Sequence, residues 1–304
     1  MHALVPKVVY LADCATRVDL YEQSIADERA YVAAWLARAR DMWRSQGGSS
    51  YFAARHPDQG EEVANGIDAI LVIQIDDLYK AVGIEAKRPG LGTPRGWDNK
   101  LPAPKLSRFH HQLNKQSYLA SKGWAMGAMF INEICPGVAG PAGTDRHGAT
   151  FMQQPPLLAA SPAIVGGTPH HWKTPDLLPL LAVGPSYNLE EMLEMVIACE
   201  SGIAMSEKHL LESAAGSVAR LQDEESMPLD PDEDLDEFSP GAHRSTVLLR
   251  KLCRYTGACS AVLMDASGPY QGEVDIRPRW RESALQRTLK PATGRTTPRP
   301  RPRF

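Results

Sequence analysis

The sequence has few cysteines and no paired pattern among them. Its five cysteines, Cys14, Cys135, Cys199, Cys253 and Cys259, are scattered, odd in number, and none belongs to a C-x-x-C pair. Disulfide frameworks and zinc sites rely on regularly spaced cysteines. The five residues are therefore predicted to be reduced thiols of the core rather than disulfides or zinc ligands.

The chain also lacks a long apolar run. No stretch reaches the roughly 20 residues of a membrane-spanning helix, and the start, M-H-A-L-V-P-K, lacks the apolar segment of a secretory signal. We therefore expect a cytoplasmic protein without a membrane partner. With 304 residues, 43% of them hydrophobic and 23% charged, the chain can bury a full core.

A large net charge is missing as well, but the formal value of -3 hides two segments of opposite sign. From Asp223 to Glu237 nine of fifteen residues are acidic, whereas Ile276 to Phe304 holds eight arginines and one lysine against one glutamate. We expect a disordered acidic linker at 223–241 and a disordered basic tail at 276–304. The tail suits nucleic-acid backbones, and self-inhibition by the acidic run stays open.

The most informative stretch runs from Gly66 to Pro89 and predicts a hairpin. Apolar segments on either side of Asp76-Asp77 indicate two strands joined by a tight turn. If the turn is symmetric about that pair, Gln74 faces Tyr79 and Asp68 faces Glu85. Because side chains alternate along a strand, Lys87 shares the face of Glu85, while Ala86 points the other way.

Two carboxylates opposite each other destabilise a sheet, and a divalent cation would remove the conflict. Asp68, sixteen intervening residues and then Glu85-Ala86-Lys87 resemble the D…E-x-K core of the PD-(D/E)xK, or restriction-endonuclease-like, nuclease superfamily. The resemblance is to its RecB-like and VRR-type members, although Asn65-Gly66-Ile67 replaces the proline that gives the family its name.

The resemblance implies a function for each matching residue. Asp68, Glu85 and the Ala86 carbonyl would bind Mg2+ or Mn2+, and Lys87 would assist the attacking water. Gln112, in the following helix, matches a glutamine that lies near the metal or substrate in the family. A further acidic ligand would be Glu28, Glu61 or Glu62, and a solvated glutamate is the open alternative for each.

The remaining pattern predicts an α/β fold, with a restriction-endonuclease-like core (a mixed central sheet flanked by helices) and a helical, partly disordered C-terminal extension. The segments that carry this prediction are a strand at 7–12, a helix at 19–46, a helix at 107–122 and a strand at 124–132. We divide the chain into a core at 1–155, a loop-rich and helical extension at 156–222, the acidic linker at 223–241, a small helix-strand element at 242–275 that docks on the main body, and the basic tail at 276–304.

Basic side chains around the hairpin predict a nucleic-acid surface. The loop from Arg88 to Lys105 contains four Pro, three Gly and four Lys or Arg residues. The predicted contacts are Lys80, Arg88, Arg95, Lys100, Lys105, Arg108 and Lys115.

We thus expect a metal-dependent nuclease that hydrolyses phosphodiester bonds, with DNA favoured by family precedent. The alternatives are a non-catalytic nucleic-acid-binding protein that keeps the fold, and a structural or regulatory protein whose hairpin charges are solvated. A homodimer stays open.

Overall fold

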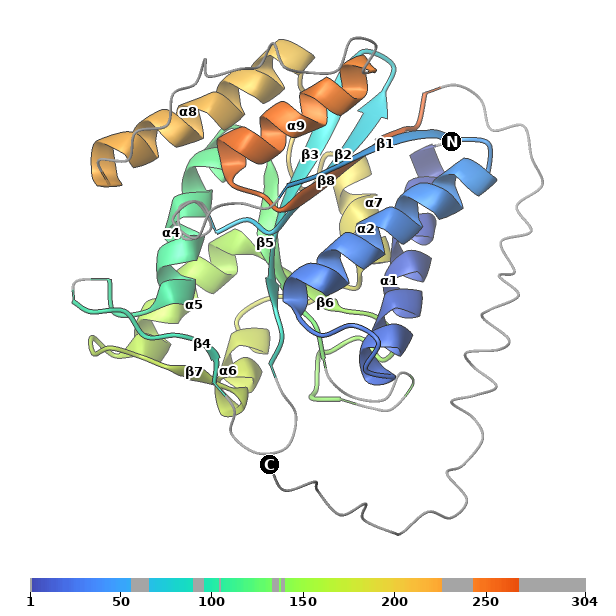
Figure 1. Ribbon diagram of the computed structural model, residues 1–304. Helices are drawn as coiled ribbons and strands as arrows, with labels where there is room; N and C mark the ends of the chain where they lie inside the picture. Colours follow the sequence, from blue (N-terminus) through green and yellow to red (C-terminus); the bar gives the residue numbers. More distant parts are fainter. Residues whose placement is uncertain are drawn as a thin grey trace, which may run out of the picture.

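The computed structural model describes residues 2–55, 66–89, 96–103, 105–132, 137, 140–225 and 243–267. These residues form a mixed central sheet with helices on both faces (Figure 1). The α/β class with a flanked mixed sheet is thereby confirmed. None of the described helices is long and apolar enough to cross a membrane.

The sheet has six strands in the order β1-β8-β2-β3-β5-β6 within the described residues. The two central neighbours β2 and β3 are antiparallel, and each has a parallel partner on its outer side, β8 and β5 respectively. The edge strands β1 and β6 pair antiparallel with β8 and β5. The strand bounds are β1 Ser49–Ala54, β2 Ala69–Ile75, β3 Leu78–Lys87, β5 Ala125–Phe130, β6 Thr150–Gln153 and β8 Ser260–Asp265.

The predicted hairpin is present with its predicted register. Ile75 pairs with Leu78 and Gln74 with Tyr79, and this pairing continues to Ala69 opposite Ile84. Asp76 takes a left-handed backbone conformation (φ 56°) that aspartate tolerates in tight turns. Both strands are buried along most of their length, which explains why their sequences are continuously apolar rather than alternating.

Two apolar layers enclose the sheet. Side chains such as Leu71, Ile73 and Ile84 pack with helices α1 (Val5–Tyr21), α2 (Glu28–Ser45) and α7 (Leu189–Ile197) on one face. Ile70, Val72 and their neighbours pack with α8 (Glu207–Glu225) and α9 (Arg244–Thr256) on the other face. A third cluster joins α4 (Arg108–Ser121), α5 (Gln154–Val165) and α6 (Leu177–Leu181) beside β5.

The N-terminal prediction was wrong in two respects. Residues 7–12, predicted as a strand, lie inside α1, since Val5, Val8, Val9 and Ala12 also follow the helical period and bury one stripe. The helix predicted over 19–46 is interrupted between Tyr21 and Glu28, where Asp27 caps α2 by accepting a hydrogen bond from the Ala30 N–H at 2.8 Å.

The second half is more ordered than predicted. The region from β6 to α6, which includes the start of the extension predicted to be loop-rich at 156–222, contains β6, α5, β7 (Trp172–Lys173), the short 3-10 helix η2 (Thr174–Asp176) and α6. The expected helix and strand within 242–275 are present as α9 and β8, and β8 lies inside the sheet between β1 and β2. The sheet therefore extends beyond the core predicted at 1–155. The acidic linker, apart from the end of α8, and the basic tail lie outside the described residues.

Candidate active site

Asp68 is the first residue outside the β2–β3 ladder, and backbone bonds hold it on two sides. Its N–H donates to the Ile84 carbonyl at 2.8 Å, and its own carbonyl accepts from the Cys259 N–H at 3.0 Å. Its carboxylate Oδ2 accepts a hydrogen bond from the Ala86 N–H at 2.7 Å. The start of β2 is thus tied to the E-A-K sequence at the end of β3 and to the loop before β8.

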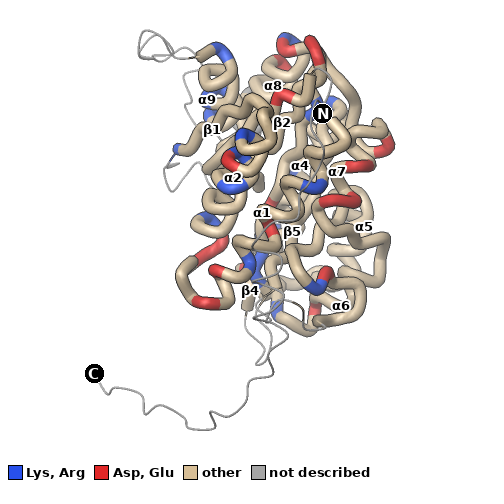
Figure 2. Tube along the Cα trace, turned by 90° about the vertical axis from the view of Figure 1, so that its right-hand side faces the viewer, with Lys and Arg blue, Asp and Glu red and all other residues tan. Residues whose placement is uncertain are grey.

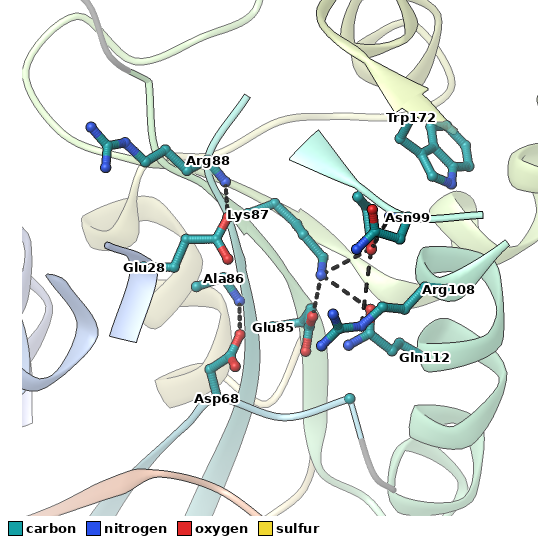
Figure 3. Close-up of polar contacts among 12 residues, drawn as sticks. Glu28, Asp68, Glu85, Ala86, Lys87, Arg88, Asn99, Arg108, Gln112 and Trp172 are labelled. Atoms are coloured by element: carbon teal, nitrogen blue, oxygen red, sulfur yellow. Dashed lines mark hydrogen bonds and ion pairs between the residues drawn. The ribbon is translucent and has the colours of Figure 1, made fainter. Parts of the chain in front are cut away.

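Lys87 ends β3 and is surrounded by acceptors (Figure 3). Its Nζ lies 2.5 Å from Glu85 Oε1 and 3.0 Å from Asp98 Oδ2, and it donates a hydrogen bond to Gln112 Oε1 at 3.1 Å. Glu85, Lys87, Asp98 and Gln112 are all buried. Glu85 and Lys87 share one strand face as predicted, and α4 brings Gln112 to that face.

The carboxylates of this site are held in an unfavourable environment. Burial raises the pKa of Glu85 from 4.5 to about 8, and the negative charge of Asp68 adds to the rise, which Lys87 offsets only in part. Burial also raises the pKa of Asp68 from 3.8 to about 6, although the residue as a whole is only half-buried. The pKa of Lys87 is raised because the surrounding carboxylates, Glu85 foremost, outweigh the opposite effect of burial.

A small polar cavity opens onto these groups. Its volume is about 230 Å³, and it is lined by Glu28, Arg29, Asp68, Glu85, Lys87, Gly96, Trp97, Asp98, Asn99 and Arg108. In Figure 2 acidic and basic positions lie close to one another beside β4 (Gly96–Asp98). The cavity is the size of a small anion with several waters, and its walls carry charges of both signs.

Of the three residues predicted as a further acidic ligand, Glu28 lies in the described part of the chain and lines this cavity. It stands at the first position of α2, and its Oε1 accepts a hydrogen bond from the Arg88 N–H at 2.5 Å. Burial raises its pKa, while Lys87 has the opposite effect. The competing residues Glu61 and Glu62 lie outside the described residues.

The arrangement has the donors that a hard divalent cation prefers. Glu85 Oε2 is buried and has no hydrogen-bond partner in the described part of the chain. The Ala86 N–H bonds to Asp68, and the carbonyl of a strand residue projects to the same edge as its N–H, so the Ala86 carbonyl faces the Asp68 side as well. These three oxygens fit Mg2+ or Mn2+ in kind. No group of three or more His, Cys, Asp or Glu side chains is placed to hold a metal ion among the described residues.

The predicted phosphate contacts are distributed unevenly. Arg108 lines the cavity. The Arg88 guanidinium donates to the Ala26 carbonyl at 2.8 Å and points away from Lys87 (Figure 3). Lys100 and Lys105 are exposed between β4 and α4, and Lys115 follows Gln112 by one turn of α4. Arg95 lies outside the described residues.

Lys80 is not at the site. Its Nζ is buried and lies 2.7 Å from the Val196 carbonyl and 2.9 Å from the Ile197 carbonyl, at the end of α7, with Cys199 Sγ also at 2.7 Å. Lys80 and Lys87 are seven residues apart in one strand, so their side chains point to opposite faces. Its position argues against the predicted phosphate contact and assigns the ammonium to the α7 C-terminus, where a cation is favourable.

Asp98 was missed in the sequence, where it lies within a loop chosen for its basic residues. It is buried beside Lys87 because β4 pairs with β7, 74 positions further along the chain at Trp172. The available signal was local: an acidic residue directly after a tryptophan in a stretch of Gly, Pro and basic residues. The adjacent histidines His170 and His171 lie on the loop before β7, and His170 Nε2 is 3.1 Å from Asp176 Oδ2.

No protein-family model, no curated protein and no solved structure matches the chain. The assignment of a function therefore depends on the geometry of the site itself.

Proposed function

We propose that the chain is a metal-dependent nuclease that hydrolyses phosphodiester bonds, with DNA as the substrate, a restriction-endonuclease-like core and a cytoplasmic location. The observation that carries the proposal is the convergence of Asp68, Glu85 and Lys87 on one polar cavity, with a buried carboxylate oxygen of Glu85 that has no partner among the described residues. Charged residues are rarely fully buried unless they are paired, and carboxyl groups with strongly shifted pKa values concentrate at functional sites.

Each residue has a defined contribution. Asp68, Glu85 and the Ala86 carbonyl would hold the cation. Bound Mg2+ or Mn2+ would supply a more acidic water and stabilise negative charge on the phosphate. Lys87, whose raised pKa keeps it an ammonium at neutral pH, offers positive charge to a phosphate oxygen or orients a water. Gln112 fixes that ammonium from α4, and Arg108 supplies positive charge at the cavity wall.

One observation favours a non-catalytic nucleic-acid-binding protein instead. The described residues contain no group of three or more metal-ligating side chains, and only two of the three donors named above are side chains. A protein that kept the fold and the basic residues would bind DNA without divalent cations.

Cleavage of DNA with and without Mg2+ separates the two functions. Asp68→Ala, Glu85→Ala and Lys87→Ala should each abolish Mg2+-dependent cleavage, because removing one residue of a unit costs about as much activity as removing all of them. Asp77→Asn, in the exposed turn at the far end of the same hairpin, is the matched control. Circular dichroism has to accompany the assay, since removing Lys87 breaks its buried ion pairs with Glu85 and Asp98 and should lower the free energy of unfolding by about 3–5 kcal/mol. Full activity in a folded carboxylate variant would refute the nuclease.

A further inference from the structure

Asp98 is held in place by a scaffold that reaches well beyond its own loop. Its neighbour Trp97 packs against Phe109 and Trp172 with ring centroids 5.3 Å away in each case, and donates from Nε1 to the Lys173 carbonyl at 2.8 Å. The Trp172 Nε1 in turn donates to Ser107 Oγ, the N-cap of α4, at 2.6 Å. The aromatic cluster therefore fixes β4 relative to the helix that carries Gln112 and Arg108.

The carboxylate of Asp98 makes an ionic contact rather than a directed hydrogen bond with Lys87. Its Oδ1 accepts from the Asn99 N–H at 2.7 Å and lies 4.0 Å from Arg108 Nε. Its Oδ2 lies 3.0 Å from Lys87 Nζ, yet accepts no aligned hydrogen bond in the described residues. The contact with Lys87 therefore depends on the negative charge of Asp98 more than on the orientation of its carboxylate.

The contact with Asp98 is needed to hold the Lys87 ammonium in a single position. Its side chain has four rotatable bonds, and an ammonium has three donors. Its three contacts come from three elements: two ion pairs, with Glu85 on β3 and Asp98 on β4, and a hydrogen bond to Gln112 on α4. Without Asp98 the ammonium would keep one contact on its own strand and one on α4, and could swing between them.

We propose that Asp98 is a positioning residue, which holds the Lys87 ammonium where the scissile phosphodiester meets the site. This inference rests on the proposed function, since it gives Lys87 a substrate to act on. Asp98 itself does not bind the nucleic acid, because a carboxylate repels a phosphate. Its effect should therefore fall on the catalytic rate and leave substrate affinity nearly unchanged.

Steady-state cleavage by Asp98→Asn tests the rate effect, with Asp77→Asn as the control. The asparagine keeps the shape of the side chain and removes its charge. We therefore expect kcat to fall roughly 10–100-fold, the loss typical when a residue that orients an active-site group is replaced. KM should stay within about twofold. Asp98→Glu, which restores the charge, should recover part of that loss. Unchanged or faster cleavage by a folded Asp98→Asn variant would overturn the inference.

A second measurement does not depend on cleavage. Ammonium protons of a fixed lysine exchange slowly with water and are observed by 1H–15N NMR, with the Lys87→Met variant identifying the Lys87 signal. Asp98→Asn should broaden or remove this signal, and Asp77→Asn should leave it intact. An unaltered signal in Asp98→Asn would overturn the inference. Wild-type protein that cuts no DNA would refute the proposed function separately, whatever the signal shows.

Discussion

The side-chain carboxylate of Asp68 accepts a hydrogen bond from the backbone N–H of Ala86, with an N···O distance of 2.7 Å. Ala86 stands between Glu85 and Lys87, so this bond controls the strand end that presents both of their side chains. Asp68 is therefore a structural partner of the E-A-K sequence as well as a ligand for the proposed cation.

The two roles of Asp68 are separable by substitution. Asp68→Asn keeps a carbonyl oxygen that can accept from Ala86, whereas Asp68→Ala removes the acceptor. We expect both variants to lose Mg2+-dependent cleavage. Only Asp68→Ala should also lower the free energy of unfolding, by about 1–3 kcal/mol, because it leaves the buried Ala86 N–H without an acceptor. Urea unfolding and DNA cleavage on both proteins measure the two effects, and equal stabilities would show that the bond contributes nothing.

The raised pKa of Glu85 predicts how the metal-free protein responds to pH. Because the folded carboxyl has a pKa of about 8 against an ordinary 4.5, the folded state binds a proton that the unfolded chain has lost between these values. Stability from this group is fully present below about pH 4.5 and is lost as pH rises through 8, with a slope of at most about 1.4 kcal/mol per pH unit.

Comparison with Glu85→Gln isolates this effect from other titrating groups. The stability of the wild type relative to Glu85→Gln should fall between about pH 5 and 8.5 in EDTA, as followed by thermal or urea unfolding. Mg2+ should restore wild-type stability mainly at the upper end, since the cation binds the ionised form and stabilises the folded state by mass action. A pH-independent difference between the two proteins would contradict the assignment of a high pKa to Glu85.

Gly66 lies where the chain enters the site, and its replacement should disturb Gln112. Its φ is +62°, and a Cβ there would meet Gln112 Cβ at 2.6 Å and Gln112 Cα at 2.9 Å. Gly166 has a similar φ of +64° and open space around it. Both alanine variants carry the cost of a left-handed backbone, about 1 kcal/mol. Only Gly66→Ala should also lower cleavage, because it moves the side chain that accepts from Lys87.

Unfolding curves and cleavage rates for Gly66→Ala and Gly166→Ala test this difference. We expect similar backbone costs, with an additional loss of stability and activity in Gly66→Ala alone. If the two variants behaved alike in both measurements, close packing between Gly66 and α4 would have no part in the site.

The parts of the fold that local patterns determine were predictable. The register of the hairpin follows from two apolar runs around Asp76-Asp77, and alternation along β3 correctly separated Ala86 from Glu85 and Lys87. Gln112 was assigned by resemblance, and its contact with Lys87 depends on how α4 packs, which no local pattern specifies.

The parts that long-range pairing determines were not predictable from the sequence. β8 enters the sheet between two strands of the first half, and β4 pairs with β7 across 74 positions. Asp98 reaches Lys87 only because of the second pairing. The face on which Lys80 lies could have been predicted, since it follows from the same alternation that groups Glu85 with Lys87.

The location of β8 makes a prediction about the C-terminal third of the chain. β8 ends at Asp265 and fills the sheet between β1 and β2. Deleting residues 243–304 would remove it with α9, expose two strand edges and free the Asp68 carbonyl from Cys259, so this protein should not fold. Deleting only Arg277–Phe304, which lies outside the described residues, should leave the melting temperature unchanged.

The shorter deletion should nevertheless weaken DNA binding. Arginine pairs with phosphate through a planar fork and stays charged, so each engaged arginine releases condensed counterions. Removing the eight arginines of the tail should lower affinity uniformly across sequences. It should also flatten the slope of log K against log[salt] by roughly 0.9 for each phosphate of duplex DNA that the tail no longer neutralises. Cleavage at saturating DNA and low salt should survive, since the proposed metal ligands precede the tail.

The competing outcome is that Trp280 and Leu285 anchor the tail to the folded body, with its arginines neutralising the acidic run at 223–237 instead of a substrate. Deletion would then leave the salt slope unchanged and lower the melting temperature or the solubility, the reverse of the first outcome. Fluorescence anisotropy over a salt series, with melting curves on full-length protein and the 1–276 fragment, distinguishes the two. Because an interaction with DNA affects the salt slope and an internal interaction affects the melting temperature, each outcome has its own measured quantity.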